Sequence, residues 1–272
     1  MITGYQKENR QYLTMPPVPE AGFHVSNFWD NDDVEVLENG GPFSVFAYMR
    51  DLSVLPHEAA MKYYMSEMNC LKKQLVCRLN GSGVILQAGA MQWMAGKIQQ
   101  TSGIKGAGDL LKKSVVGKAT GEGTVKPEYV GTGVVVTEPT YLHYLLEDLS
   151  DWGGSVVLQD GLFCAAENAI KTSVVMRNRV SGLAAGEGLF NLCLSGKGYF
   201  AVECRVPREE LIVVDLDNGE IRIDGSYAVM WSKDLTLTVE RSGKTLLGSA
   251  VSGEGLVNVY RGTGRVVMMP QV

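Results

Sequence analysis

The stretch Gly253–Gly264, GEGLVNVYRGTG, is the most informative part of the sequence, because its pattern occurs three times in the chain. Gly186–Gly198, GEGLFNLCLSGKG, and Gly121–Gly133, GEGTVKPEYVGTG, have the same Gly-Glu-Gly entry and the same closing Gly-x-Gly. The entries begin 65 and then 67 residues apart. A nearly constant period of this kind indicates one structural unit that is copied along the chain.

The segments around these phrases have the alternation of β-strands. Leu75, Cys77 and Leu79 alternate with their neighbours, which predicts a strand with one buried and one wet face. VILQAG at Val84–Gly89 resembles VVLQDG at Val156–Gly161 and, more loosely, IRIDG at Ile221–Gly225. An apolar run follows each copy, so each predicts a strand, a short glycine turn and a second strand. We therefore expect an all-β domain over residues 71–272, built from three pseudo-threefold repeats of β-hairpin units, with one or two short helices.

Residues 1–70 form an N-terminal extension with its own elements. Residues 1–22 are polar, contain three prolines and predict an arm on the surface or a partly disordered tail. The apolar run at 43–49 predicts a strand, and residues 57–69, after Pro56, predict a helix. A second helix is expected at residues 107–116.

One face of the first helix carries Met61, Tyr64, Met65 and Met68. This face either packs on the core or forms an adaptable surface for a partner, because Met-rich surfaces repack easily.

Composition limits the classes of function. The 272 residues carry a net charge of −5, and the lysine pairs Lys72-Lys73 and Lys112-Lys113 are interpreted as solvated surface. This charge pattern argues against a general nucleic-acid binder. No run approaches the ~20 apolar residues of a membrane helix. The five cysteines lack CxxC spacing and no secretion signal is visible, so we expect free thiols and a cytoplasmic location.

Residue types that carry chemistry are sparse. His24, His57 and His143 are far apart and have no metal-ligand spacing. We therefore predict no catalytic residue, no cofactor-binding residue and no metal ligand. The repeated glutamates need a separate interpretation and are Glu122, Glu187 and Glu254. They could converge near a pseudo-threefold axis as an interaction site, but we favour a structural role in which each carboxylate bonds backbone N–H groups of its own turn.

The same motifs resemble a known family. Residues 253–264 and 186–198 look like its two C-terminal signatures, and Ala88–Met91 followed by Trp93-Met94 resembles its N-terminal hairpin. The family is the altered-inheritance-of-mitochondria-twenty-four family, long known as a bacterial domain of unknown function, and the resemblance runs from about Leu71 to Val272.

The resemblance implies a fold like that of the tryptophan RNA-binding attenuation protein, a β-sandwich with double-stranded β-helix character and threefold repetition. Eukaryotic members have an organising role at the mitochondrial inner membrane. The family has no established catalytic residues, and RNA binding is not expected here because the chain is acidic.

Three hypotheses of function follow. The first is a non-catalytic scaffold or interaction protein, with an unknown protein partner or a second copy of the chain. The alternative is a small-ligand-binding protein that uses clefts between the β repeats. The third is an uncharacterised enzyme. An exposed apolar patch would favour the first, a pocket with convergent polar groups the second, and perturbed Cys or His groups beside a pocket the third.

Overall fold

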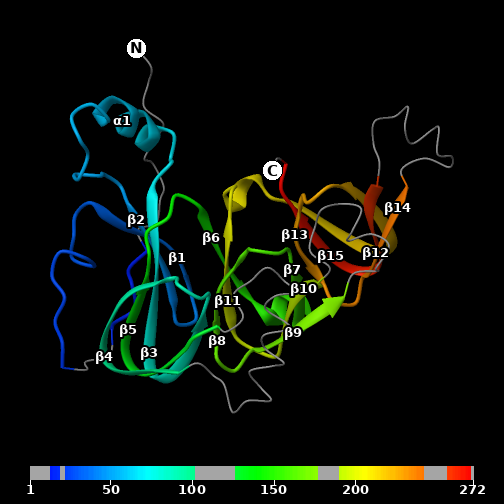
Figure 1. Ribbon diagram of the computed structural model, residues 1–272, viewed down its shortest axis with the longest axis horizontal. Coiled ribbons are helices and arrows are strands. Elements are labelled where there is room, and N and C mark those ends of the chain that lie inside the picture. The colour runs from blue at the N-terminus through cyan, green and yellow to red at the C-terminus, as the bar shows by residue number, and fades with distance from the viewer. Residues whose placement is uncertain (1–12, 19–21, 102–125, 177–189, 242–255, 271–272) are drawn as a thin grey trace.

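The computed structural model (Figure 1) describes residues 13–18, 22–101, 126–176, 190–241 and 256–270. These residues form an almost entirely β structure, which confirms the predicted class. An eight-stranded sheet holds β1 (Val34–Gly40), β2 (Phe43–Tyr48), β3 (Lys72–Leu86), β4 (Met91–Thr101), β5 (Glu128–Thr137), β6 (His143–Asp148), β8 (Phe163–Glu167) and β11 (Tyr199–Cys204). A seven-stranded sheet holds β7 (Ser155–Leu158), β9 (Lys171–Met176), β10 (Phe190–Ser195), β12 (Ile212–Asp224), β13 (Ala228–Ser232), β14 (Thr236–Arg241) and β15 (Leu256–Met268). The helices are α1 (Ala59–Glu67) and the short 3₁₀ turns η1 (Leu149–Trp152) and η2 (Arg208–Glu210).

The N-terminal extension is joined to the β domain through strand pairing. The strand expected at 43–49 is confirmed as β2, which pairs with β1 on one side and with the first half of β3 on the other. The helix expected at 57–69 is confirmed in position as α1. Figure 1 shows α1 projecting from the end of the molecule that holds β1–β5. The helix expected at 107–116 lies outside the described residues.

The same pairing pattern occurs three times. In the first unit, residues 72–137, β5 lies between β3 and β4 and pairs with both. In the second unit, residues 143–204, two strands take this central place. β10 lies between β7 and β9, and β11 lies between β6 and β8. In the third, residues 212–268, β15 lies between β12 and the strands β13 and β14. Superposition of the units about a pseudo-threefold axis stays a prediction.

One detail differs from the expected hairpins. The strands on either side of each short glycine turn, such as β3 and β4, pair with the third strand of their unit and not with each other. The turns themselves are present, with left-handed glycines at Gly89, Gly161 and Gly225. The hydrogen-bonded partner of each strand therefore comes from much further along the chain.

The Gly-x-Gly phrases mark places where backbones approach closely. Gly131 and Gly133 lie inside β5 with φ of +146° and +147°. A Cβ atom on Gly133 would lie 2.1 Å from the carbonyl oxygen of Ala95 in the neighbouring strand. β3 carries an irregularity opposite this point, between Asn80 and Ser82. Only glycine fits such a position, because any side chain would strike the backbone of β4.

Neighbouring units share their cores in a regular way. Two residues after the second glycine of the phrase, Val135, Phe200 and Val266 are buried in the cores of the first, second and third units. The next residue lies on the opposite face of the strand and packs in the core of the preceding unit. Ala201 of the second unit packs in the core of the first, and Val267 of the third packs in the core of the second. Its equivalent in the first unit, Val136, has no preceding unit and packs instead with Phe28 of the N-terminal extension.

Candidate functional site: a groove beside strand β1

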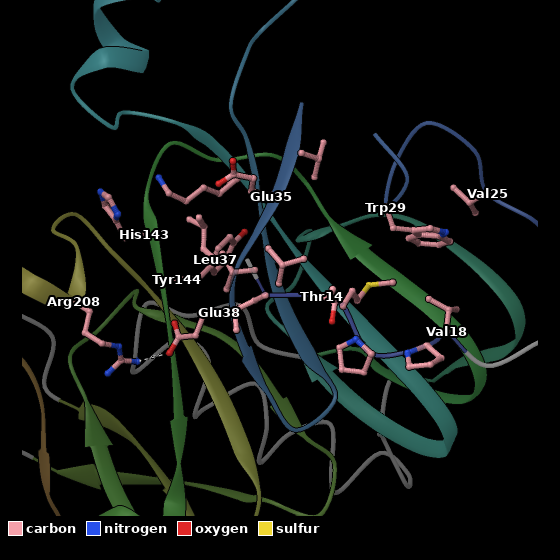
Figure 2. Close-up of a pocket in the computed structure, with 18 of the residues that line it drawn as sticks. Thr14, Val18, Val25, Trp29, Glu35, Leu37, Glu38, His143, Tyr144 and Arg208 are labelled. Carbon is pink, nitrogen blue, oxygen red and sulfur yellow. Dashed lines mark hydrogen bonds and ion pairs between the residues drawn. The ribbon is translucent and has the colours of Figure 1, made fainter. Parts of the chain in front are cut away.

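A large groove runs along β1, the edge strand of the eight-stranded sheet. Strand order places β1 and β6 at the two ends of this sheet, yet the sheet curls so that they lie in contact. The groove has a volume of about 1360 Å³. Figure 2 shows His143, Tyr144 and Arg208 on one side of β1, and Thr14, Val18, Val25 and Trp29 on the other. The groove is therefore polar at one end and largely apolar at the other.

The N-terminal segment builds the apolar end. Leu13 forms an antiparallel bridge with Val36 of β1, and the Asn39 side-chain amide donates a 3.2 Å hydrogen bond to the carbonyl oxygen of Thr14. Met15, Val18, Phe23, Val25 and Trp29 are half-buried against a cluster that includes Phe28 and Phe46. The surface arm expected for residues 1–22 is thus ordered on the sheet from residue 13 to 18, where apolar side chains hold it.

Arg208 links the two edge strands. Its guanidinium donates hydrogen bonds to Glu38 of β1 at 3.0 Å, and to the Glu147 carboxylate and the Leu146 carbonyl oxygen of β6 at 2.6 and 2.8 Å. The backbone N–H of Leu146 donates to the Glu38 carboxylate. Burial raises the pKa of Glu38, while Arg208 acts in the opposite direction. These side chains therefore satisfy the backbone N–H and C=O groups of Leu146 on the free edge of β6.

Lys73 and His143 stand at the polar end. Lys73 follows the alternation that buries Leu75 and Cys77, and it is only 2% exposed. Its ammonium donates a 2.9 Å hydrogen bond to the carbonyl oxygen of Leu71. Its backbone pairs with Thr140, which brings the start of β6 and His143 beside it. Burial lowers the pKa of Lys73, and burial together with the charge of Lys73 lowers the pKa of His143.

The wall behind this end is fixed by buried hydrogen bonds. The hydroxyl groups of Tyr144 and Thr137 are 3.1 Å apart and share a hydrogen bond, and Thr137 Oγ1 accepts another from the backbone N–H of Leu75. Burial raises the pKa of Tyr144, so its phenol stays protonated at neutral pH. The polar end of the groove therefore has one rigid wall.

The residues that the sequence singled out lie elsewhere. Met61, Tyr64 and Met68 are 55%, 67% and 77% exposed, Met65 is half-buried, and no residue of α1 is buried. The expectation that this helix packs on the core is therefore wrong, and the alternative of a partner-binding face stays a prediction. Glu122, Glu187 and Glu254 lie outside the described residues.

Sequence reasoning missed the groove residues. Lys73 was interpreted as solvated surface, and the structure corrects this, because Lys73 lies on the buried face of β3. The signal was present: the apolar alternation of Leu75, Cys77 and Leu79, extended backwards by one step, reaches Lys73. His143 and Arg208 had no comparable signal, because only the curled sheet brings them to β1.

Four of the five cysteines are buried. Burial raises the pKa of the Cys77, Cys164, Cys193 and Cys204 thiols, which keeps them in the weakly nucleophilic protonated form. In the described part of the chain, no group of three or more His, Cys, Asp or Glu side chains is arranged to hold a metal ion. Nor does any described helix have the length and apolar character needed to cross a bilayer.

Comparisons with known proteins agree with this fold. An uncharacterised protein of Streptococcus pyogenes serotype M6 is 23% identical over 205 residues, which cover 69% of this chain and 76% of that protein. A crystal structure of a Streptococcus pyogenes protein has 22% sequence identity and a TM-score of 0.54, covering 73% of this chain and 88% of the other. Residues 68–271 match the family described as mitochondrial biogenesis AIM24. This span agrees with the resemblance seen in the sequence, and the chain belongs to the mitochondrial biogenesis AIM24 family.

Proposed function

We propose that this chain is a non-catalytic interaction protein that holds an extended segment of a partner protein in the groove along β1. The observation that carries the proposal is the size of the groove. Its volume of about 1360 Å³ exceeds the roughly 300–1,000 Å³ of common small-molecule pockets. A chain-shaped ligand fills such a space better than a compact one.

The walls also suit a peptide. β1 is an edge strand, and among the described residues its outer edge is paired only by the single bridge between Val36 and Leu13. Exposed edges bind added strands through main-chain hydrogen bonds, while pockets beside them select side chains. The apolar end at Val25 and Trp29 and the polar end at His143 provide two such selecting surfaces. We also propose a cytoplasmic location, which the five free cysteines support.

Selection of random 12-residue peptides displayed on phage tests the groove. We expect enriched peptides to bind the purified protein and to lose at least about tenfold in affinity with Val25→Asp, because a carboxylate in the apolar end must be desolvated by the ligand. Fluorescence anisotropy of the labelled peptides gives the affinities. Absence of enriched peptides would count against the proposal.

Val175→Asp is the matched control, since Val175 is exposed on β9 and does not line the groove. Peptides that bind this variant as tightly as the wild type show that added negative charge alone does not abolish binding. Equal affinity for Val25→Asp and the wild type would place the peptides outside the groove and contradict the proposal.

A further inference from the structure

We propose that the end of the groove at Lys73 and His143 is an anion-binding subsite, which takes a carboxylate or phosphate group of the ligand; this rests on the function proposed for the groove. The described structure assigns neither residue an acidic hydrogen-bonding partner. The chemical class is an anionic group carried by a partly apolar chain. An acidic side chain of a partner peptide or its terminal carboxylate belongs to this class.

The first reason is the state of Lys73. An ammonium group has three N–H donors, and here one is used, by the carbonyl oxygen of Leu71. Lys73 is only 2% exposed to solvent, and no carboxylate among the described residues lies within ion-pair distance of its Nζ atom. A buried charge without a counterion costs free energy, and proteins rarely keep one without a use. An anion in the groove would supply the missing partner.

The second reason is the placement of His143 beside this ammonium. Both residues line the same groove, and His143 follows three residues after Thr140, whose backbone is hydrogen-bonded to that of Lys73. In keeping with this placement, burial and the charge of Lys73 lower the pKa of His143. The charged group that acts in the opposite direction is Glu209, on η2. An anion bound between Lys73 and His143 would favour the protonated imidazole and gain a second donor.

The third reason is rigidity. Hydrogen bonds of 2.7 and 2.8 Å between the backbones of Lys73 and Thr140 hold the start of β6 against β3. Tyr144, next to His143, is locked to Thr137. Both side chains are therefore mounted on fixed strands, and ordering them for a ligand costs little conformational entropy.

The surroundings define the rest of the ligand. Leu37 and Val45 line the same groove and continue the apolar surface away from Lys73. A bare inorganic ion would leave this surface uncovered. The ligand should therefore combine an anionic head with at least a short apolar stretch.

Three probes separate the anionic head from the apolar chain: octanoate, octyl phosphate and octan-1-ol. They are titrated into the full-length, isotopically labelled protein, and NMR chemical shifts of His143 and of the Leu37 and Val45 methyl groups give the affinities. We expect at least one of the two anions to bind about tenfold or more tightly than octan-1-ol. A preference for one anion identifies the source of the charge as carboxylate or phosphate.

Lys73→Met removes the charge and keeps the length of the buried stem. We expect this variant to bind octan-1-ol as the wild type does and to lose the preference for anions. Lys72→Met is the matched control, because the neighbouring Lys72 is half-exposed and paired with Asp51 at 3.4 Å. If Lys73 had only a structural role, Lys73→Met would change stability and leave the ratio of affinities unchanged.

His143→Gln gives an independent readout should Lys73→Met fold poorly, with the exposed His57→Gln as its control. Loss of a fewfold in anion preference with His143→Gln alone supports the subsite. Equal affinities of the wild type for all three probes, or a preference that survives both variants, would overturn it. If the peptides described above bind while the anions show no preference, the subsite is wrong and the groove function stands. If the anions show the preference and no peptide binds, the peptide-binding function is wrong and the anion subsite stands.

Discussion

Gly133 is a single residue whose missing side chain allows two strands to meet. Its φ is +147°, and a Cβ atom would lie 2.1 Å from the Ala95 carbonyl oxygen. Gly89 also has a positive φ, +81°, but a Cβ atom there would meet nothing within 4 Å. We expect Gly89→Ala to cost about 1–2 kcal/mol of unfolding free energy, from backbone strain alone. Gly133→Ala should cost about 3 kcal/mol or more, because β4 must also move.

Urea unfolding of the two variants, followed by circular dichroism, measures this difference. Equal loss in both would show that backbone strain alone sets the cost and would contradict the close approach. The sequence could predict such positions, since repeated glycines indicate a repeated backbone need, and Gly196, Gly198, Gly262 and Gly264 all have positive φ. The alternation of Leu75, Cys77 and Leu79 could have placed Lys73 on the buried face, but it could not show that the sheet curls to form a groove there.

At the scale of elements, Arg208 on η2 joins β1 to β6. Because burial raises the pKa of Glu38, the folded protein keeps a proton that the unfolded chain releases near its ordinary pKa of 4.5. The contribution of Glu38 to stability therefore falls as pH rises above that value. Arg208→Ala removes the cation that opposes this shift. We expect it to cost about 1–3 kcal/mol at pH 7 and clearly less at pH 4, where its partner Glu38 is largely protonated.

Thermal melts of Arg208→Ala at both pH values measure this effect. Arg265→Ala is the matched control, because Arg265 pairs with the exposed Asp215 and should cost under about 1 kcal/mol. A loss from Arg208→Ala that is the same at pH 4 and pH 7 would mean that Glu38 is not its important partner. The double variant Arg208→Ala, Glu38→Gln should lose most of the pH dependence.

Elements were predicted better than their contacts. Alternation located β3 and the apolar run located β2, because the pattern of buried residues along a strand can be seen in a few neighbouring residues. Periodicity also located α1, but it could not tell whether a partner for its Met-rich face exists, and no residue of this helix is buried. In the same way, a short glycine turn predicted a hairpin between β3 and β4. The competing strand β5, about 40 residues away from β3, forms the pairs with both.

At the scale of the whole molecule, the three units form a row with unlike ends. Ile85 of the first unit pairs with Ala166 of the second, and Val157 of the second pairs with Trp231 of the third, in the same register relative to the glycine phrases. Figure 1 shows β4 and β12 at opposite ends of the row. At the first end, the face that would receive a preceding unit is covered by the N-terminal extension, where Phe28 packs 5.5 Å from the ring of Trp93. The extension therefore covers this end of the molecule, much as a capping repeat covers the end of a repeat array.

This arrangement predicts which strands lose stability when a residue of the N-terminal extension is substituted. Phe28→Ala should cost about 3 kcal/mol and open the sheet face beneath it, because it removes the aromatic side chain that packs on Trp93 and Phe46. Native-state hydrogen exchange should then show lost protection in β4 and β5, with protection in β12 and β15 nearly unchanged, since repeat-like units transmit stability mainly to their neighbours. Phe200→Ala, which truncates a fully buried ring in the central unit, should instead lower protection in all three units. A uniform loss of protection with Phe28→Ala would mean that the units unfold as one body and that the extension is part of a common core.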